Sequence, residues 1–593
     1  MRRQQTVTRG LLALAAVAVA FAAADTYVVV MALPDMLGAV GYSSEELQRA
    51  APIISGFLLG YVAMLPLIGR IADLRGRLPV LGASMVVFAL GSLVTALSYD
   101  MASMVAGRFL QGLGGGGLVP ATLALVADLY PVQRRAVPLG VVSAVQELGS
   151  VLGPLFGAVV LAVADWRAIF LVNLAAGLVL AVGLVAMRGT ARRVEPEGAP
   201  APASRPPPDL LGALLLLVTL AAGALVFVRP SQLLRDLTWG RLFIPWAGDG
   251  RWFTPIGAVT VAAAVLLVVR CATARRPLVD LPGWWSSMRE ADLLGAAYLA
   301  VALGGVVLAF ATADPAVELF ADQGWWYLGA AALASAAFVV HVRTAARPLV
   351  PRGAMRARPA WGAVLVSFFV GAALIAAVVD IPVFARTTIH RDSQLDAALV
   401  LVRFLLALPV GAVLGGFLTR RFGAGPVAAA GMLVSAGAFG WMTTWQMDTL
   451  HHLDANVPLV LCGLGFGLAL PPVNAAVLAG TADDVHGLAS AFVVVGRMVG
   501  MLVGISALTA IGLRRFYQSQ EDHPLPPARE VCEGRTRCKE FSDLLAAQGI
   551  PQEHAVFAGA AVCAVAAAVL ALLLFRGVVT RGVPTADLLR AAG

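Results

Sequence analysis

The sequence has few charged residues for its length. Of its 593 residues, 13% are charged and 59% are hydrophobic, whereas a soluble chain is about 25% charged and about 45–50% apolar. So little charge cannot cover a water-facing surface of this size. This excludes an ordinary soluble enzyme, a nucleic-acid-binding domain and a disordered protein. The composition predicts a polytopic membrane protein.

Lysine, cysteine and catalytic motifs are also scarce. Lys539 is the single lysine, and most arginines lie in short segments between apolar stretches. No basic domain can therefore follow nucleic-acid phosphates, despite a net charge of +8. Five cysteines are too few for a disulfide scaffold. There is no G-x-x-x-x-G-K-[ST] loop, no G-x-S-x-G turn and no third metal ligand beside His451 and His452. We therefore expect no enzyme activity, no cofactor and no metal.

Apolar stretches long enough to cross about 30 Å of hydrocarbon recur along the whole chain. Because backbone polar groups need partners inside the bilayer, we expect each stretch to be a helix and the fold to be all-α. Sixteen spans are predicted, at residues 11–33, 50–70, 79–97, 102–129, 138–163, 168–187, 210–228, 256–271, 293–312, 327–342, 361–383, 397–418, 426–443, 457–479, 486–512 and 555–575. The basic N-terminus and first run also resemble a signal peptide, but the run exceeds 20 residues, which favours an uncleaved first helix.

The distribution of arginine predicts the sidedness of the loops. If the first span begins inside, the inner segments are rich in arginine, whereas the short outer segments 98–101, 313–326 and 444–456 contain none. Since positive charge favours the cytoplasmic side, we expect both termini to be cytoplasmic. The predicted location is the plasma (inner) membrane, as a multi-pass protein.

The spans divide into six, four and six. Residues 1–187 form a first six-helix half, and the Pro- and Ala-rich segment 188–209 is predicted as a cytosolic linker. Residues 210–359 form two additional hairpins, which begin with the same DLLGA phrase; this is either a duplication or a chance match. Residues 360–593 form a second half that includes a polar extracytoplasmic loop, 513–554. Two six-helix halves around a central cavity are a recurrent transporter design.

The loop after the second span has the pattern G-x-x-x-D-x-x-G-R. We expect Asp73 to accept hydrogen bonds from a neighbouring helix N-terminus and the arginines to face the cytosol. The second half has a decayed copy, with Thr419 where the acid would be. Any latch should therefore depend on the first copy, whose motif residues are Gly69, Asp73, Arg75, Gly76 and Arg77.

This loop resembles the signature loop of the major facilitator superfamily. RFLQG at 108–112 is similar to the basic-residue motif of that family, and GSVLGPLFG at 149–157 is similar to its antiporter motif. DTYVVVMALP at 25–34 and WRAIFLVN at 166–173 resemble the drug/proton antiporter branch with extra central helices. The resemblance implies a major facilitator fold and efflux of drugs, with drug resistance as its usual consequence.

A narrower resemblance is to the mycobacterial lipid and drug exporters, which carry triacylglycerides with a periplasmic lipoprotein. It rests on DTY at 25–27, QELG at 146–149, LALPVG at 406–411, and HG at 486–487 through RM at 497–498. That group usually has fourteen spans, so the second central hairpin departs from it. The resemblance implies a proton-coupled antiporter of amphipathic compounds or lipids, in contact with membrane lipids and with a periplasmic lipoprotein as a partner. The alternatives are a general multidrug efflux antiporter and a non-transporting receptor or assembly protein.

Charged residues inside predicted spans are the candidates for proton coupling, since each costs several kcal/mol unless it is paired or hydrated. The residues expected to act in coupling are Asp25, Arg108, Glu147 and Arg497. The alternative interpretation is static ion pairing that fixes helix packing. Asp380 lies near a predicted outer end and fits both interpretations equally, and Arg403 matches no motif.

Two further features have a structural and a functional interpretation. Gly149, Gly153 and Gly157 recur every four residues beside Pro154, as in a helix face that either packs closely or slides. Cys532 and Cys538 lie together in the segment 513–554, where they either form a disulfide or remain free thiols. The spans that flank this segment are candidates to project beyond the membrane, as the resemblance to the lipid exporters implies.

Overall fold

The computed structural model describes residues 2–41, 51–192, 209–247, 250–311, 323–389, 394–522, 526, 528–532 and 538–578, and every regular element among them is a helix. Fifteen of the helices are long and apolar enough to cross a membrane. The predicted all-α, polytopic architecture is confirmed. The count of sixteen, which includes α5, stays a prediction.

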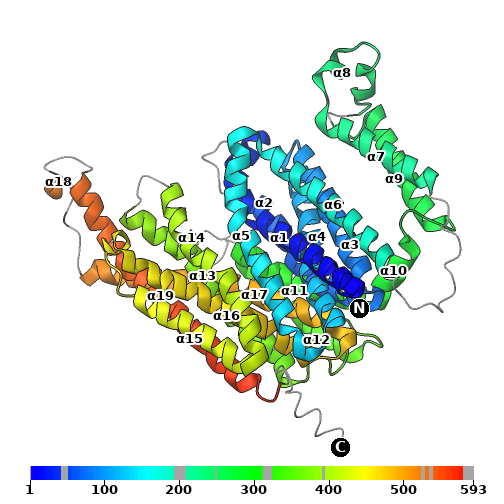
Figure 1. Cartoon of the computed structure of the whole chain (residues 1–593). Helices are drawn as coiled ribbons and strands as arrows, with labels where there is room; N and C mark the ends of the chain where they lie inside the picture. The colour runs from blue at the N-terminus through cyan, green and yellow to red at the C-terminus, as the bar shows by residue number, and fades with distance from the viewer. Residues whose placement is uncertain are drawn as a thin grey trace, which may run out of the picture.

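The helices follow the predicted six-four-six order (Figure 1). The first six are α1 (Arg2–Ala39), α2 (Ala51–Arg75), α3 (Arg77–Leu97), α4 (Met101–Leu129), α5 (Ala136–Val163) and α6 (Trp166–Arg192). The middle segment contains α7 (Leu210–Val228), α8 (Ser231–Arg235), α9 (Pro255–Thr273), α10 (Leu281–Glu290), α11 (Leu293–Ala311) and α12 (Gly324–Thr344). The last group is α13 (Arg358–Thr388), α14 (Gln394–Phe422), α15 (Ala424–Met442), α16 (Asn456–Ala479), α17 (His486–Asp522), α18 (Ala528–Val531) and α19 (Lys539–Leu574).

The two halves repeat one packing plan. Helix α1 packs on α5, α2 on α4 and α3 on α6, and the counterparts α13 on α17, α14 on α16 and α15 on α19 do the same in the second half. Each half is thus built from the same helix neighbours. The halves meet along two seams, where α2 packs on α17 and α5 packs on α14.

Local sequence signals set several helix boundaries. Asp100 caps α4: its Oδ1 accepts from the Ser103 amide at 2.8 Å, and the Ser103 hydroxyl lies 3.3 Å from the Asp100 amide as a reciprocal acceptor. Asp209 caps α7 in the same position, with the Gly212 amide 3.0 Å from its Oδ1. Prolines occur inside several spans, which packed neighbouring helices tolerate in a membrane bundle.

The structure is more helical than expected after residue 512. Helix α17 continues to Asp522 and α19 begins at Lys539, although the sequence predicts spans that end at 512 and begin at 555. The polar residues there form helix because α17 and α19 pack together. Within the predicted linker, 188–192 continue α6 and 193–208 lie outside the described residues, so the predicted division of the chain stays a prediction.

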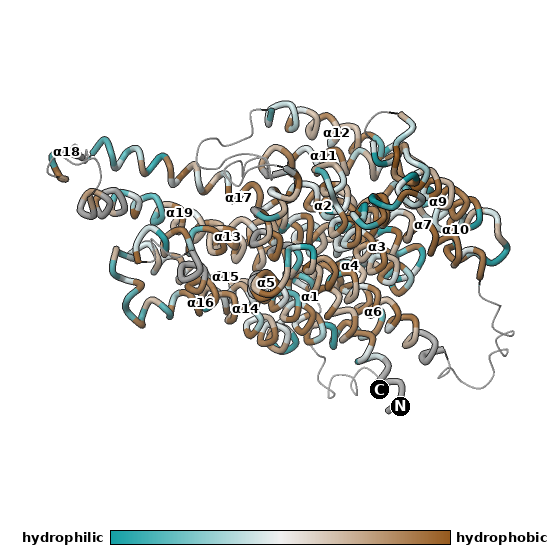
Figure 2. Tube along the Cα trace, turned by 90° about the horizontal axis from the view of Figure 1, so that it is seen from above, coloured by the Kyte–Doolittle hydropathy of each residue, from teal (hydrophilic) through white to brown (hydrophobic). Residues whose placement is uncertain are grey.

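The two additional hairpins occupy different places. Helices α7 and α9 pair with each other and touch the first half mainly through α3 and α10. Helices α11 and α12 lie beside α2 and α17, on the opposite side of the bundle from α5 and α14 (Figure 2). The short amphipathic α10 was not expected from the sequence and joins the two hairpins.

Candidate functional site

Asp25 lies at the centre of a buried polar network in the first half. Its Oδ2 accepts from Arg108 Nη1 at 2.6 Å. Its Oδ1 accepts from Gln111 Nε2 at 2.9 Å and from Asn173 Nδ2 at 2.6 Å. Donors from α4 and α6 thereby satisfy both carboxylate oxygens of a residue that is 1% exposed. This network offsets the cost of a charge in an apolar bundle.

Arg108 is held from several directions. Its Nη1 also donates to Gln111 Oε1 at 2.7 Å, and its guanidinium lies over the Phe57 ring at 4.4 Å from the ring centroid. Gln111 in turn donates to the Ser92 hydroxyl at 2.9 Å. The guanidinium is therefore paired, hydrogen-bonded and covered by an aromatic face, which favours a fixed position.

The glycines of the antiporter motif bring α5 against α1 beside Asp25. A Cβ on Gly153 would lie 2.5 Å from the carbonyl oxygen of Ala24, the residue before Asp25. A Cβ on Gly149 would clash with the carbonyl oxygen of Ala20, one turn away. Gly157 is buried in the same helix, and Pro154 lies within it. Only glycine permits this approach of two helix backbones.

Glu147 and Arg497 form an ion pair between the two halves. Glu147 Oε1 on α5 lies 3.7 Å from Arg497 Nη1 on α17, and each side chain is 11% exposed. This separation is too long for a hydrogen bond, so attraction between the charges is the interaction that the pair provides. The four residues predicted for coupling thus form two separate pairs, of which only this one bridges the halves.

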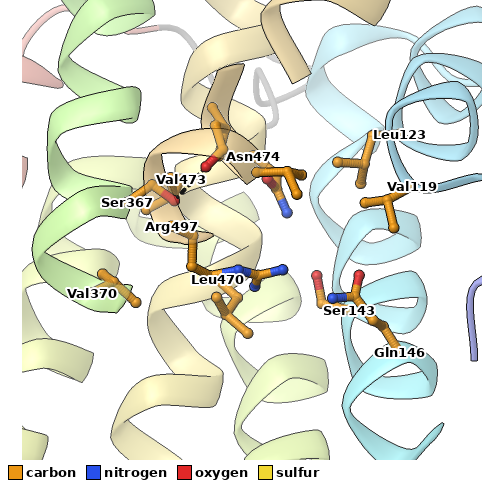
Figure 3. Close-up of a pocket in the computed structure, with 12 residues that line it drawn as sticks. Val119, Leu123, Ser143, Gln146, Ser367, Val370, Leu470, Val473, Asn474 and Arg497 are labelled. Carbon is orange, nitrogen blue, oxygen red and sulfur yellow. Dashed lines mark hydrogen bonds between the residues drawn. The ribbon is translucent and has the colours of Figure 1, made fainter. Parts of the chain in front are cut away.

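A small cavity lies beside this ion pair (Figure 3). It has a volume of about 20 Å³ and lies between α4, α5, α13, α16 and α17. Arg497 extends toward Ser143 and Gln146 across the cavity, while Val119, Leu470 and Val473 supply apolar walls. Room for one water needs about 10–15 Å³, so this centre holds water at most and not an organic substrate. The halves are closed together at this level.

The α2–α3 loop fastens the first half to the N-terminus of α17. Asp73 Oδ1 accepts from the Gly487 amide at 2.7 Å and its Oδ2 accepts from the Leu488 amide at 2.9 Å. A carboxylate at a helix N-terminus is stabilised by free amides and by the helix dipole. A Cβ on Gly69 would lie 2.6 Å from the Gly487 carbonyl oxygen, so the motif glycine permits the close approach.

The arginines of this loop do not simply face solvent, as expected. Arg77 is 8% exposed and donates to the Asp483 carbonyl at 2.7 Å, because its charge also pairs with Asp73 at 3.0 Å. Arg75 instead pairs with Asp280 before α10, at 2.7 Å. The hydrogen bond from Arg75 holds the pKa of Asp280 below its usual range. Gly76 has φ +96 at the turn into α3, a conformation that favours glycine.

The second copy of the loop makes a different contact. The Thr419 hydroxyl donates to the Gly415 carbonyl of its own helix at 2.7 Å. One turn earlier, Gly416 packs against the α5 backbone, where a Cβ would lie 2.7 Å from the Ala136 carbonyl oxygen. This seam thus depends on small residues rather than on a carboxylate.

Several polar residues with a place in these networks were not assigned a role from the sequence. Gln111 and Asn173 both contact Asp25, and a polar amide in an apolar helix was the signal available. Glu553 on α19 is 2% exposed and feels the charge of Asp380 on α13. Arg403 is exposed on α14, away from the ion pairs. Among the described residues no His, Cys, Asp and Glu cluster has the form of a metal site.

Cys532 and Cys538 form a disulfide in the structure, between α18 and the start of α19. Cys271 and Cys462 are free and buried. The disulfide joins residues that follow α17 to the first residue of α19, so it links the two helices that extend past the predicted spans.

The sequence matches a known family. A family model described as Major Facilitator Superfamily matches residues 15–346. The chain is 34% identical over 514 residues to the triacylglyceride transporter of Mycobacteroides abscessus, covering 85% of this chain and 82% of that protein. It is 32% identical over 575 residues to the triacylglyceride transporter of Mycolicibacterium smegmatis, covering 94% and 86%. It is 33% identical over 516 residues to the triacylglyceride transporter of Mycobacterium tuberculosis H37Rv, covering 84% and 82%.

Solved structures share the fold. The proton:xylose symporter XylE, bound to 6-bromo-6-deoxy-D-glucose, has a TM-score of 0.52 and 13% identity, covering 95% of each chain. The human organic anion transporter MFSD10 has a TM-score of 0.51 and 14% identity, covering 96% of this chain and 98% of that one. At these identities the likeness concerns the arrangement of helices alone.

Proposed function

The chain belongs to the major facilitator superfamily and is a multi-pass membrane transporter rather than an enzyme, and from this premise we propose that it is a proton-coupled exporter of lipids such as triacylglycerides. The observation that carries the proposal is the Glu147–Arg497 pair, which joins the two halves at 3.7 Å. A pair in this position must break whenever the halves separate at the centre.

Protonation of Glu147 supplies the means to break the pair. A neutral Glu147 no longer attracts Arg497, so the halves are free to part; loss of the proton restores the attraction and favours closure. Water in the adjacent cavity gives the proton a path to the carboxyl. Proton movement and rocking of the halves are thereby tied to one contact.

Asp25 has a supporting role in this proposal. Its network lies within one half, and its two oxygens receive three side-chain donors. A proton added there removes the charge that holds Arg108, and so changes the packing of α1 on α4 and α6. Asp25 would then report protonation to the helix that faces Glu147, since α1 packs on α5.

The membrane orientation follows from the arginine pattern. The α2–α3 loop with its arginines would lie in the cytoplasm, in the inner membrane of a bacterium, with both termini on that side. The fastened loop then represents a closed cytoplasmic end, and the structure represents an outward-facing or occluded state.

A lipid substrate is supported by the relatives and by the lining. Three relatives that are 32–34% identical over most of the chain are named triacylglyceride transporters. The central cavity has mostly aliphatic walls around few polar groups, which suits an uncharged lipophilic molecule. A periplasmic lipoprotein is the proposed acceptor, with the long ends of α17 and α19 nearby.

Reconstitution tests the proposal. Purified protein in liposomes is given a fluorescent triacylglycerol and a pH gradient, and transfer of lipid to acceptor vesicles is measured. We expect transfer that depends on the gradient and falls to the level of protein-free liposomes in Glu147→Gln, while Glu290→Gln, an exposed acid, behaves as the unmodified protein.

Other outcomes separate the alternatives. Gradient-dependent movement of cationic dyes without triacylglycerol transfer would favour a multidrug antiporter. Absence of gradient-dependent movement of lipid or dye by folded protein would contradict transport and favour a receptor.

A further inference from the structure

The two seams between the halves are alike in plan but differ in what lies outside them. Seams of this kind are where a bundle of two rocking halves can open toward the bilayer. One seam joins α2 to α17, and the other joins α5 to α14. A lipid dissolved in the bilayer could reach the centre through a seam without entering water. What covers each seam therefore decides the route.

Helix α11 lies over the α2–α17 seam. It packs against both α2 and α17, and α12 packs on its outer side (Figure 2). The contact face of α11 is buried: Val307 is 0% exposed, and a Cβ on Gly304 would lie 2.8 Å from Leu59 of α2. The outer helix α12 faces outward instead, with Leu333 75% exposed. The hairpin therefore stands between this seam and the bilayer.

Polar contacts hold this hairpin to the first half. Arg75 at the end of α2 pairs with Asp280 at 2.7 Å and lies over the Trp284 ring at 4.5 Å. Asp292 before α11 bonds His341 of α12 at 2.9 Å and accepts from the Leu349 amide at 2.9 Å. These contacts close the hairpin on itself and anchor its base to α2.

The α5–α14 seam has no such cover. None of α7, α9, α11 and α12 makes an extended contact with α5 or α14 in the described part of the chain. A groove of about 690 Å³ opens where α1, α5 and α14 meet. Its walls combine apolar side chains with guanidinium donors, which suit acyl chains and ester carbonyl oxygens; they include Leu12, Val141, Phe417, Arg134 and Arg420.

We propose that the α10–α12 segment seals the α2–α17 seam, so that the lipid substrate passes between the bilayer and the centre of the transporter through the α5–α14 seam alone. This inference rests on the proposed export of lipid. The first hairpin has no part in it, because α7 and α9 lie away from both seams. The groove at the open seam is the docking site for the glyceride.

Photo-crosslinking tests the route. A photoreactive phenylalanine analogue replaces Leu148 of α5, Leu406 of α14 or Leu333 of α12, which are 39%, 52% and 75% exposed. All three positions face the bilayer, so bulk lipid reaches each of them. The reconstituted protein is irradiated with a fluorescent triacylglycerol, and the labelling that excess unlabelled triacylglycerol suppresses is measured. We expect suppressible labelling at 148 and 406, and only non-suppressible background at 333.

Equal suppressible labelling at 333 and at 406, or none at 148 and 406, would overturn the inference. Transport by each labelled variant is measured beforehand with the pH-gradient assay. If the unmodified protein moves no lipid, the proposed function fails; if it moves lipid but labels equally at both seams, only the inferred route fails. A second variant, Gly304→Phe, pushes α11 from Leu59 and should create suppressible labelling at 333; labelling unchanged from background would count against the seal.

Discussion

Asp25–Arg108 and Glu147–Arg497 are both buried acid–arginine pairs, yet they differ in what they join. The first lies within one half, with N and O atoms 2.6 Å apart and side chains 0% and 1% exposed. The second joins the halves at 3.7 Å, with both side chains 11% exposed. Equal chemistry thus has unequal mechanical consequences: one pair fixes a fold, and the other is placed to break during movement.

Removal of the Asp25 charge should have the largest effect. In Asp25→Asn the buried Arg108 charge loses its partner, which costs about 3–5 kcal/mol when one member of a buried pair is removed. We expect folded protein with lower thermal stability and with lipid transport at the level of empty liposomes, measured by thermal unfolding in detergent and by the gradient assay. Asp35→Asn, an exposed acid on the same helix, is the control. Wild-type transport by Asp25→Asn would remove Asp25 from the mechanism.

Glu147→Gln should abolish gradient-dependent transport with a smaller loss of stability. Arg497 keeps its access to the central cavity, so it is less stranded than Arg108. Arg497→Gln should have the same effect, and the double variant should be no worse than either single one, since both remove one contact. An additive loss in the double variant would show that the two residues act independently.

The two loop copies should differ in the same manner. Asp73→Asn loses a charge and one of two acceptors at the α17 N-terminus, a change of about 1–2 kcal/mol in the closed state. Thr419→Ala removes only a bond within its own helix and should leave closure unchanged. Spin-label distances across the α2–α17 seam measure both variants. Equal opening in the two would contradict the unequal roles of the copies.

Asp280→Asn should have the smallest effect, because Asp280 is 56% exposed and exposed pairs contribute about 0–1 kcal/mol. The folded-state pKa of Asp280 lies below the ordinary value of 3.8, so the pair stabilises the fold above that value. The stabilisation is lost as pH falls through the lowered pKa. Thermal unfolding should therefore show a small wild-type advantage near pH 7 that vanishes at about pH 3 and in high salt. An advantage that grows toward low pH would be the wrong sign.

The sequence was sufficient for the features that depend on composition and motif. Long apolar runs predicted the helices, since hydrocarbon leaves the backbone no other partner. Gly69 and Asp73 predicted a loop that meets a helix N-terminus, and the structure places Asp73 on the first amides of α17. These features follow from local pattern.

Partner choice across the bundle was not predictable. Arg108 and Arg497 carry the same charge in similar surroundings, and only three-dimensional packing assigns one to Asp25 and the other to Glu147. The burial of Arg77 depends on Asp483, more than 400 positions away. The two hairpins begin with the same phrase, but their places around the bundle follow from contacts with α2 and α3.

Helix α17 is continuous from His486 to Asp522, 37 residues and about 55 Å in length. Its first amides hold Asp73, its middle carries Arg497, and its far end passes beyond the predicted span. Such a rod acts as a lever whose fulcrum is the packed core: release at one tip swings the other through several ångströms. Whatever docks at that far tip is therefore displaced mechanically by events on the opposite face of the bilayer, without any chemical messenger between them.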